Sequence, residues 1–226
     1  MQISLQQASK RFNKEWIFRN LDYTFELGQH YALIGNNGSG KSTLLQIIAG
    51  YSSLTKGTIH WSGNDHTTIF QQISFAAPYL ELVEEFTTME QFDFHATFKT
   101  LQPSISVNDI IERIGLKNSA HKQIRYFSSG MKQRLKLALA IFDQAPILLL
   151  DEPTAGMSPE ETLVMMDLIR TLADERTVIL VEHKMKLIMG LCNRIIVLHH
   201  GEFLAEGTPD EIQNNAEVRR VYLGQG

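Results

Sequence analysis

The chain has 226 residues, of which 43% are hydrophobic and 20% charged, with a formal net charge of −4 at pH 7. This composition is typical of a globular protein with a full core, and it argues against a broad nucleic-acid surface, which requires clustered Lys and Arg. We therefore expect one domain and no nucleic-acid partner. The longest apolar runs fall far short of the roughly 20 residues that span a bilayer, so the chain is not expected to cross a membrane by itself.

The N-terminal residues 1–7 contain neither the basic region nor the long apolar segment of a secretory signal, so the sequence predicts a cytoplasmic protein. Cys192 is the only cysteine, which excludes an internal disulfide and a cysteine zinc site. His199 and His200 have no third candidate ligand nearby, so we expect no metal role for this pair.

The order of strand-like and helix-like segments predicts an α/β fold. Short apolar segments separated by polar turns predict strands at 3–5, 21–25, 31–34 and 58–61 in the first third, with one helix at about 41–49. The middle, about 78–145, favours helices at 89–98, 108–114 and 129–142. The last third returns to alternation, with strands at 147–150, 177–181 and 194–198 and helices at 158–172 and 184–191.

Apolar strands without polar alternation, separated by helices, predict a mainly parallel sheet covered on both faces. We expect this sheet, an N-terminal antiparallel β subdomain and an α-helical subdomain at about 78–145, inserted into a single domain of residues 1–226.

A phosphate-binding loop pattern follows the predicted strand at 31–34. Its residues are Gly35, Asn36, Asn37, Gly38, Ser39, Gly40, Lys41, Ser42 and Thr43. Glycines let several backbone N–H groups face one phosphate, and the following helix adds the positive end of its dipole. Lys41 is predicted to reach the β- and γ-phosphates and Ser42 to ligate Mg²⁺, as in a P-loop NTPase core. A glycine-rich turn without a ligand is the alternative for this motif alone.

Two carboxylates, Asp151 and Glu152, follow the apolar strand at 147–150. The carboxyl end of a strand is where α/β sheets bind ligands. Asp151 is suited to hold Mg²⁺ through its water shell, and Glu152 is suited to polarise or deprotonate an attacking water. Solvated acids at a strand end would be the simpler interpretation without the phosphate loop; the two motifs together predict a nucleotide-hydrolysing site.

A further helix begins at Ser128, Ser129 and Gly130, where Ser128 is expected to cap free N–H groups that form an anion site. This segment resembles the signature motif of ABC-type ATPases, Leu-Ser-Gly-Gly-Gln, with departures at Phe127, Ser129 and Met131. The rest of the chain is similar to that family in the order and spacing of its motifs.

The resemblance implies that ATP and Mg²⁺ are bound and that hydrolysis requires two subunits. Ser128 and Gly130, with Ser129 between them, would contact the nucleotide held by a second copy of the ATP-binding subunit. His183, just past a predicted strand, would contact the γ-phosphate as the switch histidine. Phe12 would stack on adenine, and Trp16 is the alternative platform for the base.

The chain departs from the family pattern at two positions. Pro78 stands where we expect a glutamine that touches Mg²⁺, and water or Glu81 would have to fill that role. Ser158 stands where an aspartate is usual in the dimer-contact loop, and it can also cap the next helix.

The leading hypothesis is the ATP-hydrolysing, energy-coupling subunit of an ABC transporter, peripheral on the cytoplasmic face of the membrane and paired with separate membrane-spanning permease subunits. Its helical subdomain, around 78–98, would meet coupling segments of those subunits. The alternatives are a non-transport ABC ATPase acting on soluble partners and a nucleotide-sensing module that hardly hydrolyses ATP, the latter motivated by Pro78.

The transported substrate is not predicted, and the cues to direction conflict. The segment 128–131 is similar to exporter ATPases, whereas 181–187 and 205–209 resemble amino-acid importer and lipopolysaccharide-export ATPases. The balance of these cues leans slightly towards export.

Overall fold

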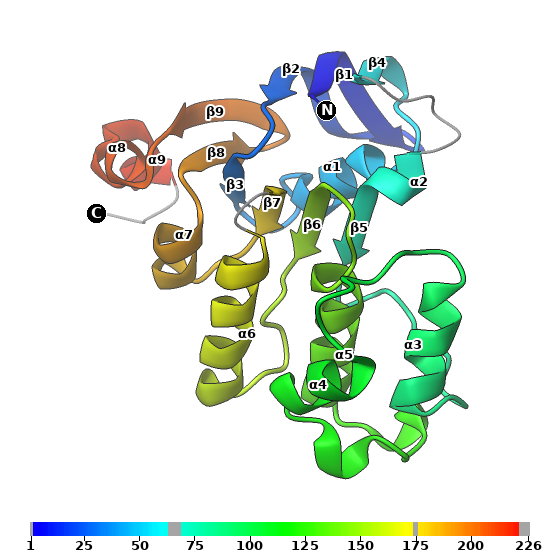
Figure 1. Cartoon of the computed structure of the whole chain (residues 1–226). Coiled ribbons are helices and arrows are strands. Elements are labelled where there is room, and N and C mark those ends of the chain that lie inside the picture. Colours follow the sequence, from blue (N-terminus) through cyan, green and yellow to red (C-terminus); the bar gives the residue numbers. More distant parts are fainter. Residues whose placement is uncertain (1, 63–68, 174–175, 222–226) are drawn as a thin grey trace.

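The computed structural model describes residues 2–62, 69–173 and 176–221 (Figure 1). Its strands are β1 (Ile3–Phe12), β2 (Glu15–Phe25), β3 (His30–Gly35), β4 (Lys56–Trp61), β5 (Ile73–Ala76), β6 (Ile147–Asp151), β7 (Thr177–Val181), β8 (Arg194–His199) and β9 (Glu202–Gly207). Its α-helices are α1 (Lys41–Ile48), α2 (Ile69–Gln72), α3 (Thr88–Ala96), α4 (Val107–Arg113), α5 (Ser129–Ile141), α6 (Pro159–Leu172), α7 (Met185–Leu191), α8 (Pro209–Asn214) and α9 (Ala216–Val221). None of the helices in this described part is long and apolar enough to cross a membrane.

The strands form two sheets. One is antiparallel, with the order β2-β1-β4, and the other has the order β5-β6-β7-β3-β8-β9. In the second sheet every neighbouring pair is parallel except β8 and β9. The predicted α/β class, with a mainly parallel sheet and an antiparallel N-terminal sheet, is therefore confirmed.

The parallel strands are buried on both faces, as their unbroken apolar sequences predict. In β6, Leu148 and Leu150 face the core that includes α5 and α6, while Ile147 and Leu149 face the core that includes α1 and the antiparallel sheet. Helix α1 therefore lies between the two sheets, and the longer helices cover the opposite face of the parallel sheet (Figure 1).

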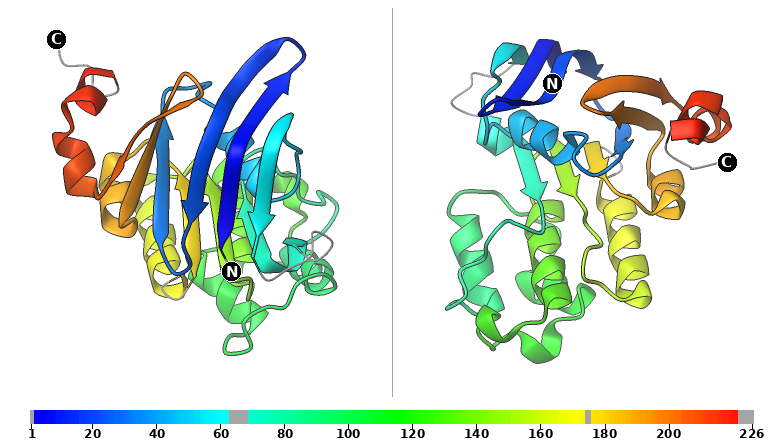
Figure 2. Two further views of the ribbon diagram at one scale, coloured as in Figure 1. Left: turned by 90° about the horizontal axis from the view of Figure 1, so that it is seen from above. Right: turned by 180° about the vertical axis from the view of Figure 1, so that it is seen from behind.

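Helices α3, α4 and α5 lie together between β5 and β6 in the chain, and in space they extend away from the antiparallel sheet (Figure 2). Each begins at a hydroxyl side chain that accepts a backbone N–H: Thr87 for α3, Ser106 for α4 and Ser128 for α5. Ser158 caps α6 in the same way, as its sequence predicts. These caps accept hydrogen bonds from N–H groups that have no partner within the helix.

Some elements differ from the sequence-based expectation. β1 and β2 are longer than the predicted segments at 3–5 and 21–25, because they continue into a hairpin that ends at Phe12 and Glu15 and mixes buried with exposed side chains. β9 was not predicted because it is a half-exposed edge strand without apolar alternation. α8 and α9 were also missed, since six residues carry too little helical periodicity.

The turn between β8 and β9 packs closely on β2, and this contact yields a stability prediction. Gly201 has φ +76°, and a Cβ atom there would overlap the backbone carbonyl of Ile17. Gly201→Ala should therefore reduce the free energy of unfolding by about 3 kcal/mol or more, because a backbone clash adds to the cost of the left-handed conformation. Denaturant unfolding measures this loss.

The matched control is Gly28→Ala. Gly28 has φ +68°, but a Cβ atom there would meet no other atom within 4 Å, so only the conformational cost of about 1–2 kcal/mol applies. Equal losses of unfolding free energy in Gly201→Ala and Gly28→Ala would show that the close contact with β2 adds nothing to the cost of the substitution.

Candidate functional site

The topology of the parallel sheet brings three chain segments to one edge. β7 lies between β6 and β3, and Val181 is the register partner of both Asp151 and Leu33. Because the three strands are parallel, the segments that follow them meet at the same edge. The phosphate-loop pattern, the carboxylate pair and His183 are therefore brought together, although they are far apart in the chain.

The loop after β3 curls around the side chain of Lys41. Its ammonium is buried and donates to the carbonyls of Gly35, at 2.9 Å, and Asn36, at 3.0 Å. Gly40 precedes α1 with φ +96°, and a Cβ atom there would lie 3.0 Å from the side chain of Ile17. Both the backbone conformation and the limited space at this position therefore require a glycine.

Burial lowers the pKa of the Lys41 ammonium, while the charges of Asp151 and Glu152 act in the opposite direction. The three groups thus belong to one electrostatic site. The loop and Glu152 border a cavity of about 320 Å³. The residues that line it are Ile17, Asn37, Gly38, Gly40, Lys41, Ser42, Thr43 and Glu152.

Asp151 is a buried carboxylate at the end of β6. It is 1% exposed, and neither of its oxygens completes a hydrogen bond with any residue in the described part of the chain. Burial raises the pKa of Asp151, whereas the neighbouring hydroxyls of Ser42 and Tyr79 act to lower it. Buried carboxylates are normally paired or hold a cation, so two unpartnered oxygens beside a serine hydroxyl fit a hard divalent cation such as Mg²⁺.

Glu152 follows Asp151 with an unusual backbone conformation. Its φ is +43°, rare for a residue with a side chain, and its N–H donates to the carbonyl of Val181 at 2.9 Å. Such strain of order 1 kcal/mol is found where surrounding structure imposes a geometry. The Glu152 Oε1 atom lies 3.3 Å from the Nε2 atom of His183, and both side chains are partly exposed. This pair can exchange a proton with water or with a bound group.

A hydrogen-bond network holds the segments behind this pair. Thr154 donates to Glu182 at 2.7 Å and accepts from Lys184 at 2.9 Å. The amide of Gln133, on α5, donates to the carbonyls of Glu152, at 3.4 Å, and Pro153, at 3.3 Å. These four side chains were not recognised in the sequence, although a polar residue directly after an apolar strand, as at Glu182, was an available signal.

Other predicted site residues lie outside the cavity. Ser128 and Ser129 are exposed at the start of α5. Gly130 packs on the loop after Glu152, since a Cβ atom there would lie 2.8 Å from the carbonyl of Gly156. Phe12 is 47% exposed near the tip of the β1–β2 hairpin.

The segment after β5 differs from the expectation placed on Pro78. The Pro78 carbonyl accepts from the Lys136 ammonium at 2.5 Å, and it is the next residue, Tyr79, whose phenol lies beside Asp151. Glu81, the other candidate to replace the glutamine, is exposed and its charge acts on Lys136. Tyr79 was not among the predicted site residues, because its contact with Asp151 joins segments that lie far apart in the chain.

Comparison with known proteins agrees with this geometry. The model of the ABC transporter family matches residues 18–155, and that of the branched-chain amino acid ATP-binding cassette transporter family matches 204–226. The high-affinity branched-chain amino acid transport ATP-binding protein LivG of Salmonella typhimurium is 34% identical over 86% of both chains. The Escherichia coli K12 protein of the same name is 32% identical over 99% of this chain and 98% of its own. A Nod factor export ATP-binding protein from Burkholderia lata is 30% identical over 97% of this chain and 76% of its own.

Solved structures share the fold. An ATP-binding subunit of an ABC transporter superposes with a TM-score of 0.87 at 23% identity, over 99% of this chain and 98% of its own. A dimeric ATP-binding cassette bound to ADP and Pi gives 0.80 at 24% identity, over 92% of this chain and 98% of its own. With the family model covering more than half of the chain and relatives above 30% identity along nearly all of it, this protein belongs to the family of ABC transporter ATPases.

Proposed function

We propose that this ABC transporter ATPase energises a transporter of branched-chain amino acids. Two observations support this substrate class: the similarity to branched-chain amino acid transport proteins along the chain, and the separate match of residues 204–226 to a model named for such transporters. They favour the amino-acid cues in 181–187 and 205–209 over the export cue in 128–131.

The observation that carries the hydrolytic function is the convergence of the phosphate loop, Asp151, Glu152 and His183 at one sheet edge. In this proposal, loop N–H groups and Lys41 bind the β- and γ-phosphates. Ser42 and Asp151 hold Mg²⁺, which neutralises charge on the phosphates when bound. Glu152 accepts a proton from the attacking water, and His183, 3.3 Å from Glu152, contacts the γ-phosphate.

Two copies of the chain form the working unit in this proposal. Ser128 and Ser129 are exposed and lie outside the cavity of their own chain, so these groups are free to contact a nucleotide on a second copy. A related cassette is dimeric. ATP that binds the closed pair of subunits more tightly than the open pair would drive closure. Hydrolysis of the ATP would then allow the pair to open.

The partners are membrane-spanning permease subunits on separate chains, with the ATPase peripheral on the cytoplasmic face. Support comes from family membership and from the helical segment between β5 and β6, which extends away from the antiparallel sheet and offers a surface for coupling segments (Figure 2).

A nucleotide-sensing module with negligible hydrolysis is the second candidate, motivated by the missing glutamine. Tyr79 stands beside Asp151 and offers a phenol instead of a carboxamide. The Glu152–His183 pair counts against this candidate, because a sensor has no need of a water-activating carboxylate. Turnover stimulated by vesicles that contain the permease subunits would eliminate it.

Glu152→Gln tests the assigned base. The variant should bind MgATP and accumulate as a closed dimer while turnover falls about 10²- to 10⁴-fold, because proton acceptance is lost and phosphate contacts remain. Phosphate release and sizing in MgATP measure the two effects. Glu112→Gln is the control, since that carboxylate is exposed and pairs with Lys117. Unchanged turnover in Glu152→Gln would overturn the assignment.

Lys41→Ala tests the phosphate loop. Removing the buried ammonium that bridges the carbonyls of Gly35 and Asn36 should weaken MgATP binding at least about 10-fold, because a charged hydrogen-bonding group is lost. Calorimetric titration measures the affinity, and Lys117→Ala, at an exposed ion pair, is the matched control. A titration equal to that of wild type would contradict the assignment.

Phe12→Ala and Trp16→Ala distinguish the two candidate adenine platforms. Arg11 pairs with Trp16 across the hairpin, and the cations of Arg11, Arg19 and Lys56 lie 5.3, 4.7 and 5.9 Å from the Trp16 ring. Phe12 pairs instead with Glu15, so its side chain projects from the opposite face. Phe12→Ala should weaken ATP binding roughly 5- to 150-fold by loss of stacking. A larger loss of ATP affinity in Trp16→Ala than in Phe12→Ala would assign the base to Trp16.

A further inference from the structure

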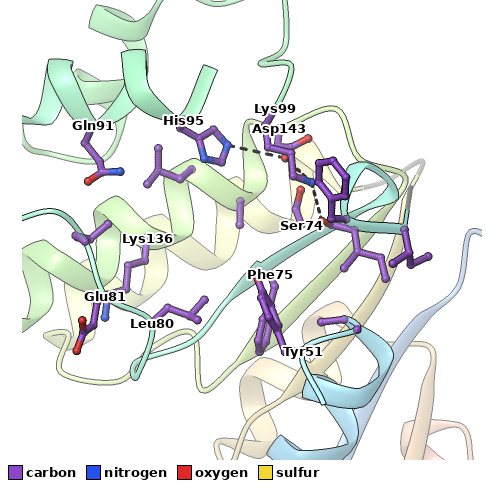
Figure 3. Close-up of a pocket in the computed structure, with 18 residues that line it drawn as sticks. Tyr51, Ser74, Phe75, Leu80, Glu81, Gln91, His95, Lys99, Lys136 and Asp143 are labelled. Carbon is purple, nitrogen blue, oxygen red and sulfur yellow. Dashed lines mark hydrogen bonds and ion pairs between the residues drawn. The ribbon is translucent and has the colours of Figure 1, made fainter. Parts of the chain in front are cut away.

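Three carboxylates are buried in the part of the chain that the structure describes: Asp143, Asp151 and Glu182. Asp151 belongs to the proposed metal site. Asp143 lies 3.4 Å from the ammonium of Lys99, on the wall of a cavity of about 470 Å³ that shares no lining residue with the cavity at the phosphate loop (Figure 3). The charge of Asp143 is thus compensated away from the site. Glu182, in contrast, directly precedes His183, and its partner is a hydroxyl group.

The hydroxyl of Thr154 contacts both sequence neighbours of His183. It donates to Glu182 Oε1 at 2.7 Å and accepts from the Lys184 ammonium at 2.9 Å. The direction of both bonds is fixed, because an ammonium can only donate and a hydroxyl carries a single proton. Thr154 and Glu182 are each 3% exposed, so their hydrogen bond is shielded from water and is stronger than one at the surface.

His183 itself contacts a different group. Its Nε2 atom lies 3.3 Å from Oε1 of Glu152, which stands two positions before Thr154. Three consecutive side chains after β7 thus meet two residues of the loop after β6: the outer two meet Thr154, and the middle one meets Glu152. The Thr154 hydroxyl therefore holds the segment of His183 from both sides while the ring of His183 reaches Glu152.

The backbone by itself fixes this arrangement only in part. The ladder between β6 and β7 ends at the Asp151–Val181 pair, after which the N–H of Glu152 donates to the Val181 carbonyl at 2.9 Å. One hydrogen bond fixes a distance but lets the loop turn about it, and Gln133 adds only two longer bonds, of 3.4 and 3.3 Å. Glu152 also has φ +43°, a conformation that a residue with a side chain disfavours. The short bond at Thr154, two residues further on, restrains the turn.

Resting on the roles proposed for Glu152 and His183, we propose that Thr154 is a positioning residue for ATP hydrolysis. Its hydroxyl sets the separation and direction of that pair by holding Glu182 and Lys184. Thr154 is not among the residues that line the cavity at the phosphate loop, so it acts on the rate of the chemical step and leaves MgATP binding unchanged.

Thr154→Val is the central test, because valine keeps the shape of threonine and removes the hydroxyl. Small displacements of reacting groups lower the rate steeply, so kcat should fall about 10- to 100-fold, with KM for MgATP within about twofold of wild type. Thr154→Ser keeps the hydroxyl and should restore kcat to within about threefold of wild type. Steady-state phosphate release by the intact chain measures both constants.

Thr88→Val is the matched control. Thr88, on α3, is also buried, and its hydroxyl has no hydrogen-bond partner within residues 2–62, 69–173 and 176–221. Its kcat and KM should equal those of wild type. Thermal unfolding of every variant separates a loss of rate from a loss of folded protein. Lys184→Met keeps the test decisive if Thr154→Val is poorly folded, because Lys184 is exposed and loss of its ammonium should still lower kcat severalfold.

The combination with Glu152→Gln distinguishes positioning from general damage to the protein. Residues that act as a unit give losses that do not add, so Thr154→Val should lower the residual turnover of Glu152→Gln less than it lowers that of wild type. The double variant should still form the closed dimer in MgATP, because the Thr154 hydroxyl serves the chemical step. Sizing in MgATP measures this dimer.

Four outcomes would count against the inference while leaving the proposed function standing. They are fully additive losses with Glu152→Gln, a kcat of Thr154→Val within twofold of wild type, equal kcat values in Thr154→Val and Thr154→Ser, and loss of the MgATP dimer in the double variant. The last would assign Thr154 to the contact between two copies. Wild type without turnover, alone or with the permease subunits, would refute the roles proposed for Glu152 and His183, and the inference with them.

Discussion

The parallel register of β6, β7 and β3 is the constraint on which the site depends. Each strand is buried on both faces, so a shift of one residue would move Leu148 and Leu150 into the core that Ile147 and Leu149 occupy. Packing thus sets the register, and the register sets where each strand ends. The placement of the candidate site therefore follows from core packing along the strands that lead into it.

At that edge of the sheet, the oppositely charged groups of Lys41 and Asp151 are both buried but form no direct ion pair. The Lys41 ammonium is held by two loop carbonyls, and the Asp151 oxygens find no hydrogen bond within the described residues. Burial shifts the pKa of each group towards its neutral form, and each group's charge opposes the shift of the other. A bound phosphate and a divalent cation would relieve both costs, as the proposed MgATP site requires.

Much of this arrangement could be predicted from sequence because its signals are local. The phosphate loop, the acids after 147–150 and the caps at Ser128 and Ser158 each depend on residues within a few positions. The contacts that were missed depend on distant segments. Gln133 meets Pro153 from another helix, and Tyr79 approaches Asp151 across the sheet edge. Neither leaves a periodicity or spacing signal.

Helix α5 connects the segments beside the site with the residues that precede β6. Its 13 residues extend about 20 Å as a single rigid element. Ser128 caps its start, Gln133 holds the carbonyls behind Glu152, Lys136 holds Pro78, and Asp143 follows its end. Since one helix carries these contacts, a displacement of α5 would act together on Pro78 and on the carbonyls behind Glu152.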